Sequence, residues 1–190
     1  MQHFLFSCVS QNVKTMDEKK LVERCLSNDR VAQKELYDKY SPLLMGLCVR
    51  YANSNEEAED ILIEGFTKIF SNLQEFRFES SLLTWMKRIM LNSAISHFRM
   101  HHKHHNQLSL DDVETSDWEV GNELPSDKLM ENDLLSLIQR MPETYRVIFN
   151  LFVVEGHSHK EIGEMLEIQE STSRSQLTRA RNWLKDRLHS

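Results

Sequence analysis

The sequence predicts an all-α protein made of two small helical domains joined by a flexible acidic linker. Only five Gly and three Pro interrupt its 190 residues, and strong helix formers are plentiful. Apolar residues recur at helical spacing on both sides of a central stretch. That stretch, residues 106–127, has poor periodicity, many acidic residues and no Lys or Arg. The predicted domains are therefore residues 17–105 and 128–190, with residues 106–127 as the linker.

The first domain is expected to begin with helical spacing from Asp17 to Tyr40, followed by a short apolar helix over residues 43–49. Ser54 and Glu57 have the spacing of a capping box and predict the start of a further helix. The apolar residues expected to face inward are Leu21, Cys25, Val31, Leu36 and Tyr40 in the first stretch, and Ile61, Leu62, Phe66, Ile69, Phe70 and Leu73 in the capped helix.

The segment "FRFESS" then breaks the periodicity, and a long helix resumes with "SLLTWMKRIMLNSAISHFRMHHKHH". Its polar residues lie largely off the apolar face and make it a basic surface. The predicted apolar face consists of Leu82, Trp85, Ile89, Ile95 and Phe98, and the polar set of Lys87, Arg88, Asn92, His97 and Arg99.

The second domain is expected to start with a short helix in "LLSLIQR". Pro142 suits the first position of the next helix, and Gly156 suits the position just after its end. Ser158 and Glu161 form a second capping box, which predicts a helix near residues 158–166. The expected core faces are Val147, Ile148, Leu151 and Phe152, and, on the last helix, Leu177, Ala180, Leu184 and Leu188.

A capped helix, a turn of about four residues and a basic last helix have the spacing of a helix-turn-helix motif. Arg174, Ser175, Thr178 and Arg179 fall at i, i+1, i+4 and i+5, on another face than the inward stripe. Guanidinium groups and hydroxyls in the first turns of such a helix can read base edges in the major groove. Arg181, Lys185 and Lys160 are better placed for phosphates. The alternative is a solvated basic helix, which charge patterning alone leaves open.

The net charge of −6 hides an uneven distribution of charge. Residues 80–110 hold four basic residues and no acidic one, and residues 171–190 hold five basic and one acidic. Residues 111–170 hold fifteen acidic and four basic residues. Two basic patches are thus separated by an acidic stretch of chain. A nucleic-acid partner therefore stays possible in spite of the negative net charge.

Cysteine usage and hydropathy predict a cytoplasmic protein. Cys8, Cys25 and Cys48 show no C-x-x-C spacing, so we expect reduced thiols and no disulfide framework. No apolar run approaches the ~20 residues of a membrane span, and the N-terminal segment lacks the basic region of a signal peptide. Met16 directly precedes a charged helical pattern, which leaves open whether residues 1–15 belong to the native chain.

Two stretches together resemble a known family. "MPETYRVIFNLFVVEGHSHKEIGEMLEIQESTSRSQLTRARNWL" resembles region 4 of extracytoplasmic-function (ECF) sigma factors, and "AEDILIEGFTKIFSNLQEFRFESSLLTWMKRIMLNSAISHFR" resembles their region 2. The resemblance covers residues 18–105 and 128–188. The segments "GHSHKEIGEML" and "TSRSQLTRAR" are most similar to the sequences of sigma factors of Bacteroidetes. The resemblance implies a factor that binds core RNA polymerase and directs promoter recognition, DNA melting and transcription initiation.

The resemblance also implies residue roles. Region 4 would read the −35 element through Arg174, Ser175, Thr178 and Arg179, aided by Arg181 and Lys160. Region 2 would hold the −10 element: the loop Phe78, Glu79, Ser80 and Ser81 would capture a flipped base, and Arg88, Asn92 and Arg99 would contact the strand. Trp85 is either a stacking platform or a core residue, with core favoured. Core polymerase would contact Asp60, Glu64 and Phe66, although Ile63 stands where the family usually has Gln.

The family further implies an anti-sigma partner, which no motif here encodes. The sequence has no Gly-rich phosphate loop, no G-x-S-x-G and no supported nucleophile, so no enzyme and no cofactor is expected. The alternatives are a helix-turn-helix regulator that binds duplex DNA alone and a metal-responsive interaction protein that uses the histidines.

The histidine-rich segment "HFRMHHKHH" has two interpretations. His97, His101 and His105 lie at i, i+4 and i+8, a spacing that can bind zinc. No Cys or carboxylate lies nearby in the sequence to complete a zinc site. We therefore interpret the segment as the C-terminal end of a DNA-binding helix, where the charge of the histidines depends on pH.

Overall fold

The structure is a computed structural model that describes residues 17–105 and 136–188. The predicted linker, residues 106–127, and residues 1–15 lie outside the described residues. The regular elements within the described ranges are all helical, which confirms the predicted all-α class. After a helix over residues 17–26, they are α2 (Arg30–Tyr51), α3 (Asn55–Asn72), η1 (Leu73–Glu75), α4 (Leu82–His105), a helix over residues 136–139, α6 (Glu143–Phe149), η3 (Asn150–Val154), α7 (His159–Leu166) and α8 (Glu170–Leu188).

The helical spacing predicted from Asp17 to Tyr40 is divided between two helices, because the chain turns between residues 27 and 29. Asn28 adopts a left-handed conformation with φ of 61°, and the Asp29 side chain caps the new helix α2. Its Oδ1 accepts hydrogen bonds from the amides of Val31 at 2.9 Å and Ala32 at 3.2 Å. This new start changes the helical phase, so Val31 is 71% exposed instead of facing inward.

The predicted separate helix over residues 43–49 was wrong, since α2 continues through it to Tyr51. Pro42 lies inside the helix, where it lacks the N–H that would donate to the carbonyl four residues earlier. The buried stripe of α2 passes through this point, with Leu36 and Tyr40 before the proline and Leu44 after it. Because side chains before and after Pro42 are buried in the same core, α2 continues as one helix through a residue type that usually interrupts helices.

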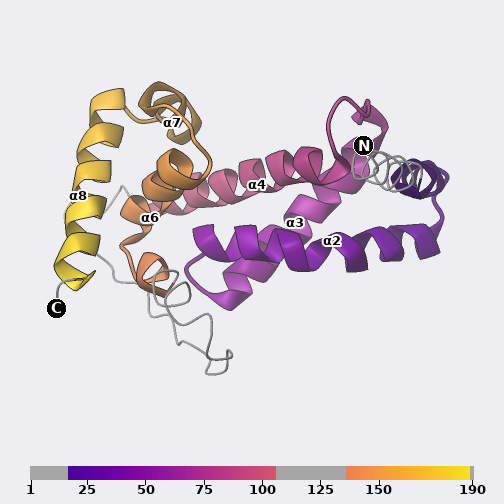
Figure 1. The fold of residues 1–190 in the computed structure, drawn as a ribbon, viewed down its shortest axis with the longest axis horizontal. Coiled ribbons are helices and arrows are strands. Elements are labelled where there is room, and N and C mark those ends of the chain that lie inside the picture. The colour runs from indigo at the N-terminus through magenta and orange to yellow at the C-terminus, as the bar shows by residue number, and fades with distance from the viewer. Residues whose placement is uncertain (1–16, 106–135, 189–190) are drawn as a thin grey trace, which may run out of the picture.

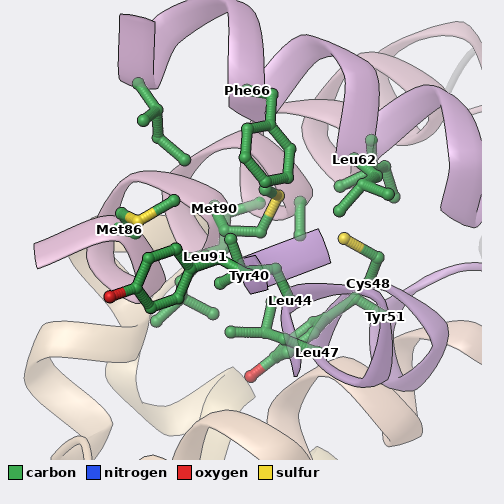
Figure 2. Packing of buried hydrophobic residues seen from close by; sticks show 14 of the residues in the cluster. Tyr40, Leu44, Leu47, Cys48, Tyr51, Leu62, Phe66, Met86, Met90 and Leu91 are labelled. Carbon is green, nitrogen blue, oxygen red and sulfur yellow. The ribbon is translucent and has the colours of Figure 1, made fainter. Parts of the chain in front are cut away.

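The first unit, residues 17–105, is organised by α2, α3 and α4 packed against one another (Figure 1). Figure 2 shows Tyr40 and Leu44 of α2 facing Phe66 of α3 and Met90 of α4. A Cβ at Gly65 would overlap the Met90 thioether, so this glycine permits the close approach of α3 and α4. The expected stripe of α3 is buried, except that Phe70 is only half-buried. The sequence did not single out the α4 core residues Met86, Met90, Leu91 and Ala94.

The second unit, residues 136–188, uses the predicted helix ends. Pro142 is the N-cap of α6, one position earlier than expected. Gly156 has φ of 78° just after η3 and its cap, as predicted. The capping box of α7 is confirmed: the Ser158 amide donates to Glu161 Oε2 at 2.8 Å, and the Glu161 amide donates to Ser158 Oγ at 3.3 Å. On α8, Leu177, Ala180 and Leu184 are buried, but Leu188 is 58% exposed.

The second unit packs on the C-terminal ends of α2 and α4 (Figure 1). One apolar core runs through both units. The residues that the second unit contributes to it are Val147, Ile148, Leu151, Ile162, Leu166 and Leu177. The loop that precedes α4 lies at the other end of that helix. Arg99, whose guanidinium contacts the second unit, lies 17 residues beyond Leu82, so about 25 Å of helix at 1.5 Å per residue separates the loop from that contact. No helix within the described ranges is long and apolar enough to span a bilayer.

Candidate nucleic-acid interface

The first turns of α8 carry a polar face that points to solvent. Arg174, Ser175, Thr178 and Arg179 are all exposed, as the sequence predicted for one face. Arg174 donates from Nε to Glu170 Oε1 at 3.1 Å, and Thr178 donates from its hydroxyl to the Arg174 carbonyl at 3.0 Å. The face therefore holds two guanidinium groups and two hydroxyls, which match the donors and acceptors that base edges and phosphates offer.

The turn between α7 and α8 fixes the angle of that face. Glu167 ends α7 in a left-handed conformation with φ of 58°, and the Ile168 amide donates to the Gly163 carbonyl at 3.0 Å. A Cβ at Gly163 would lie 2.9 Å from the Ile168 carbonyl oxygen. Glycine at this position therefore lets the turn close tightly against α7.

His159 joins three elements of the second unit, and sequence reasoning missed it. Its Nδ1 lies 3.0 Å from Oγ of the buried Ser173 on α8, and its ring stacks on Phe152 of η3 with centroids 4.4 Å apart. Burial, and then the positive charge of Arg174 and Arg181, lower the pKa of His159. A neutral imidazole thus supports α8 on the side opposite its exposed polar face. The capping box located the start of α7, but no local signal shows that this side chain meets α8.

The loop before α4 presents an aromatic ring to solvent. Phe78 is 42% exposed and has φ of 59°, and its ring centroid lies 4.6 Å from that of the buried Phe76. Phe76 in turn lies 5.4 Å from half-buried Trp85, which therefore belongs to the support beneath the loop. An exposed aromatic ring on an aromatic base is a surface on which an unstacked base can stack.

The hydroxyls and the acid of this loop are accessible. Glu79, Ser80 and Ser81 are exposed. The Thr84 amide donates to Ser81 Oγ at 3.1 Å, so this serine also starts α4. The loop thus combines solvent-accessible polar groups with the exposed ring, the kinds of group that hydrogen-bond and stack on a flipped base.

The polar side chains of α4 divide into two groups. Arg88 and Asn92 are exposed one helical turn apart, on the half of α4 nearest the loop. Arg99, two turns further on, faces the second unit: its Nη2 lies 2.9 Å from Glu167 Oε1, and its Nη1 donates to the Met165 carbonyl at 3.5 Å. Arg88 and Asn92 therefore lie exposed on the half of α4 that follows the loop, whereas Arg99 lies apart from them in contact with the second unit.

The predicted polymerase surface on α3 needs one correction. Asp60 is exposed, Glu64 is partly exposed beside Lys68, and Ile63 between them is 60% exposed. Phe66 is only 3% exposed and packs against Tyr37 with ring centroids 4.6 Å apart. Phe66 supports α3 from the core and offers no surface to a partner, because it lies on the face of α3 that α2 and α4 cover.

The histidines at the end of α4 lie next to carboxylates from other segments. His97 Nδ1 lies 3.0 Å from Glu57 Oε1, and His102 Nε2 lies 3.7 Å from Glu143 Oε2. His97 and His101 stack with centroids 5.9 Å apart. Within residues 17–105 and 136–188, no three His, Cys, Asp or Glu side chains form a group able to hold a metal ion. The side chain of His105 lies outside the described residues.

Comparison with known proteins gives the family. Residues 36–104 match the family "Sigma-70 region 2", and residues 131–184 match "Sigma-70, region 4". The chain belongs to the ECF-type sigma-70 family. The chain is 30% identical to the RNA polymerase sigma-H factor of Pseudomonas aeruginosa over 173 residues. The matched region covers 86% of this chain and 90% of the sigma-H factor. The role of the present protein is promoter recognition in transcription initiation.

A second relative and a solved structure agree with this family assignment. This sigma factor is 27% identical over 182 residues to the ECF RNA polymerase sigma-E factor of Haemophilus influenzae, with 91% of this chain and 96% of that one covered. Its fold is similar to that of the sigma factor RpoE of Bartonella quintana, solved in complex with the anti-sigma factor NepR. That similarity has a TM-score of 0.50 and 19% identity, and it covers 82% of this chain and 96% of the other.

Proposed function

We propose that this sigma factor binds core RNA polymerase, reads the −35 element with its second unit and holds the melted −10 element with its first. The observation that carries the proposal is the face of Arg174, Ser175, Thr178 and Arg179, exposed on a helix whose other side is buried and whose partner helix is capped. The proposed domains are residues 17–105 and 128–190, joined by residues 106–127.

For the −35 element, Arg174 and Arg179 are the proposed base readers. Ser175 and Thr178 would contact base edges or phosphates, and the exposed Arg181 and Lys160 would contact phosphates. Arg174 would exchange its ion pair with Glu170 for an acceptor on DNA. This exchange replaces one charged partner with another, so the guanidinium is not stranded without an acceptor.

For the −10 element, Phe78 is the proposed stacking surface, with Glu79, Ser80 and Ser81 satisfying the edge of a flipped base. Arg88 and Asn92 would contact the same strand, because they continue along α4 from the loop. Arg99 was expected to act with them. It can do so only after its contact with Glu167 is released.

For core polymerase, Asp60 and Glu64 are the proposed contacts on α3, with exposed Ile63 adding an apolar contact between them. The relatives named as RNA polymerase sigma factors support this partner. The RpoE complex supports an anti-sigma partner. We further infer a cytoplasmic initiation factor without enzymatic activity. The phrases "GHSHKEIGEML" and "TSRSQLTRAR" favour an origin in Bacteroidetes.

Run-off transcription with core polymerase on a library of genomic promoter fragments tests the proposal. The wild-type protein should direct initiation from a limited promoter set. Arg174→Ala with Arg179→Ala should reduce this by at least tenfold, since each bidentate contact contributes about 1–3 kcal/mol. Arg187→Ala is the matched control, because this guanidinium covers the Trp183 ring at 3.8 Å near the other end of α8.

Two results would contradict the proposal. Equal transcription by the double variant and by the wild type would remove the −35 assignment. Tight, specific binding of promoter duplex by the free protein, with no response to core polymerase, would instead support a conventional helix-turn-helix regulator. For the first unit, Phe78→Ala should impair opening of the promoter, measured with permanganate, while binding of the −35 element is retained.

A further inference from the structure

An acidic side chain stands at the start of α8, beside the guanidinium groups and hydroxyls of its exposed polar face. Glu170 is the first residue of this helix and is exposed, one helical turn before Arg174 and next to the exposed Ser171. Residues in the first turns of a recognition helix are those that reach base edges in the major groove. Glu170 therefore lies on the part of α8 that comes closest to the bases in the proposed complex.

One carboxylate oxygen of Glu170 is occupied and the other is accessible. Oε1 accepts hydrogen bonds from Arg174 Nε at 3.1 Å and from Nη2 of the same guanidinium. In the part of the chain that the structure describes, Oε2 accepts no hydrogen bond. The side chain of Glu170 is 45% exposed and that of Arg174 is 63% exposed, so burial fixes neither of them. The pair thus presents an acceptor and a guanidinium together to solvent.

A carboxylate on this face weakens contact with DNA unless a donor meets it. The affinity of DNA-binding proteins depends largely on cations that neutralise phosphates, and phosphates repel an acid. When Arg174 exchanges its ion pair for an acceptor on DNA, Glu170 loses its partner as well. An unpaired carboxylate in a partly desolvated groove is unfavourable, so DNA sequences that offer it no donor are disfavoured. Glu170 therefore discriminates between sequences.

The four bases differ in what they offer to a carboxylate in the major groove. Guanine presents the acceptors N7 and O6, and thymine presents the acceptor O4 and a methyl group. Adenine presents its N6 amino group beside the acceptor N7, which repels the second carboxylate oxygen. Cytosine presents its N4 amino group and no acceptor. Cytosine is therefore the base that a carboxylate at position 170 selects.

We propose that Glu170 is a specificity-determining residue for the −35 element, which selects cytosine by accepting a hydrogen bond from its N4 amino group beside a guanine that Arg174 reads. This inference rests on the proposed −35 function of α8. Residues four apart are separated by about 6 Å along a helix, and base pairs by about 3.4 Å, so the two targets lie in the same or in neighbouring base pairs. The two opposite charges of the ion pair thus read the two bases of G·C pairs.

Run-off transcription by the holoenzyme tests this proposal on a promoter from the genomic library whose −35 region is randomised, with sequencing of the transcribed templates. The wild type should prefer cytosine by at least about fivefold at one position in or beside the G·C pair that Arg174 reads. Glu170→Gln should lose this preference and favour adenine there, because a glutamine amide accepts from adenine N6 and donates to N7. The amide oxygen also keeps an acceptor for Arg174.

Glu164→Gln is the matched control. Glu164 is exposed on α7, outside the first turns of α8, so the same charge is removed from the second unit while the base preferences should stay unchanged. An acid in the first turn also favours the helix dipole and pairs with Arg174 at i, i+4. Such a structural role would change the total amount of transcript and would leave the preference at one position as it is.

Two results would overturn the proposal: an unchanged base profile in Glu170→Gln, or a wild type that accepts all four bases equally beside the guanine. Failure of the proposed function gives a different result. The wild type would then show no preference at any position of the randomised region, and Arg174→Ala with Arg179→Ala would change nothing. A preference that responds to the two arginines and not to Glu170 would overturn this inference alone.

Discussion

The two units of this sigma factor are stabilised in different ways. The first unit has helices of 22, 18 and 24 residues around a core of Leu, Met, Ile and aromatic side chains. The second has two short helices, α6 and α7, beside the 19-residue α8, with a small apolar cluster of its own and three fully buried polar side chains, Arg146, Asn150 and Ser173. Much of its apolar surface joins the core of the first unit.

Because of this difference, we expect the stability of the two units to respond differently to pH and salt. Burial of apolar surface does not depend on pH, so the first unit should keep its fold over a wide range of conditions. The second unit depends on charged and hydrogen-bonded partners, whose contribution changes with protonation and salt. The second unit, for which we propose the −35 element, should therefore be the more sensitive of the two to salt and pH.

The largest effect should follow from removing the buried cation of the second unit. Arg146→Met leaves Glu57 and Glu143 without their guanidinium and Asn53 without its donor, and should cost about 3–5 kcal/mol. Urea unfolding followed by circular dichroism would measure it. Arg140→Met, at an exposed position nearby, should change the free energy of unfolding little. Equal effects of both changes would contradict a special role for the buried group.

A slightly smaller effect should come from a cavity in the first unit. Leu44 is fully buried between α2, α3 and α4, and Leu44→Ala should cost about 3 kcal/mol. Its neighbour Leu43 is 55% exposed, so Leu43→Ala should cost well under 1 kcal/mol in the same unfolding experiment. This pair also tests whether the first unit depends on apolar packing, because the loss should be the same at pH 6 and pH 8.

The turn of the helix-turn-helix motif should respond to a single methyl group. Gly163→Ala places a Cβ against the Ile168 carbonyl, and backbone there cannot yield as a flexible side chain can. We expect a loss of about 1–3 kcal/mol and weaker use of the −35 element in transcription. Gly46→Ala is the control: a Cβ there meets nothing within 4 Å, and alanine inside α2 should stabilise by about 0.5–1 kcal/mol.

The smallest effect should come from His159, and it should depend on pH. Because its pKa is lowered in the folded state, the folded form prefers the neutral ring. Its contribution is present above the ordinary histidine pKa of about 6.5 and is lost as the pH falls below it. Thermal unfolding of His159→Gln should lose this component, whereas His157→Gln should keep it. A wild-type profile in His159→Gln would contradict the assignment.

Local sequence signals predicted helix ends well and long-range contacts poorly. The caps at Ser54 and Ser158 and the left-handed Gly156 were read correctly, because each involves groups within three or four residues. The break near Asn28 was missed, since apolar spacing continues roughly across it. The burial of Phe66 was foreseen in its apolar stripe, yet its proposed contact with polymerase conflicts with that burial.

The sequence by itself determined the helical class, the exposed polar face of α8 and the residue types of the exposed loop, because periodicity, caps and charge are properties of neighbouring residues. The tertiary structure decided that Arg146 is buried, that Arg99 faces the second unit and that two histidines of "HFRMHHKHH" meet carboxylates. The partners of Arg146 and His102 lie some 40 to 90 residues away along the chain. Only the packing of the two units brings such groups within hydrogen-bonding distance.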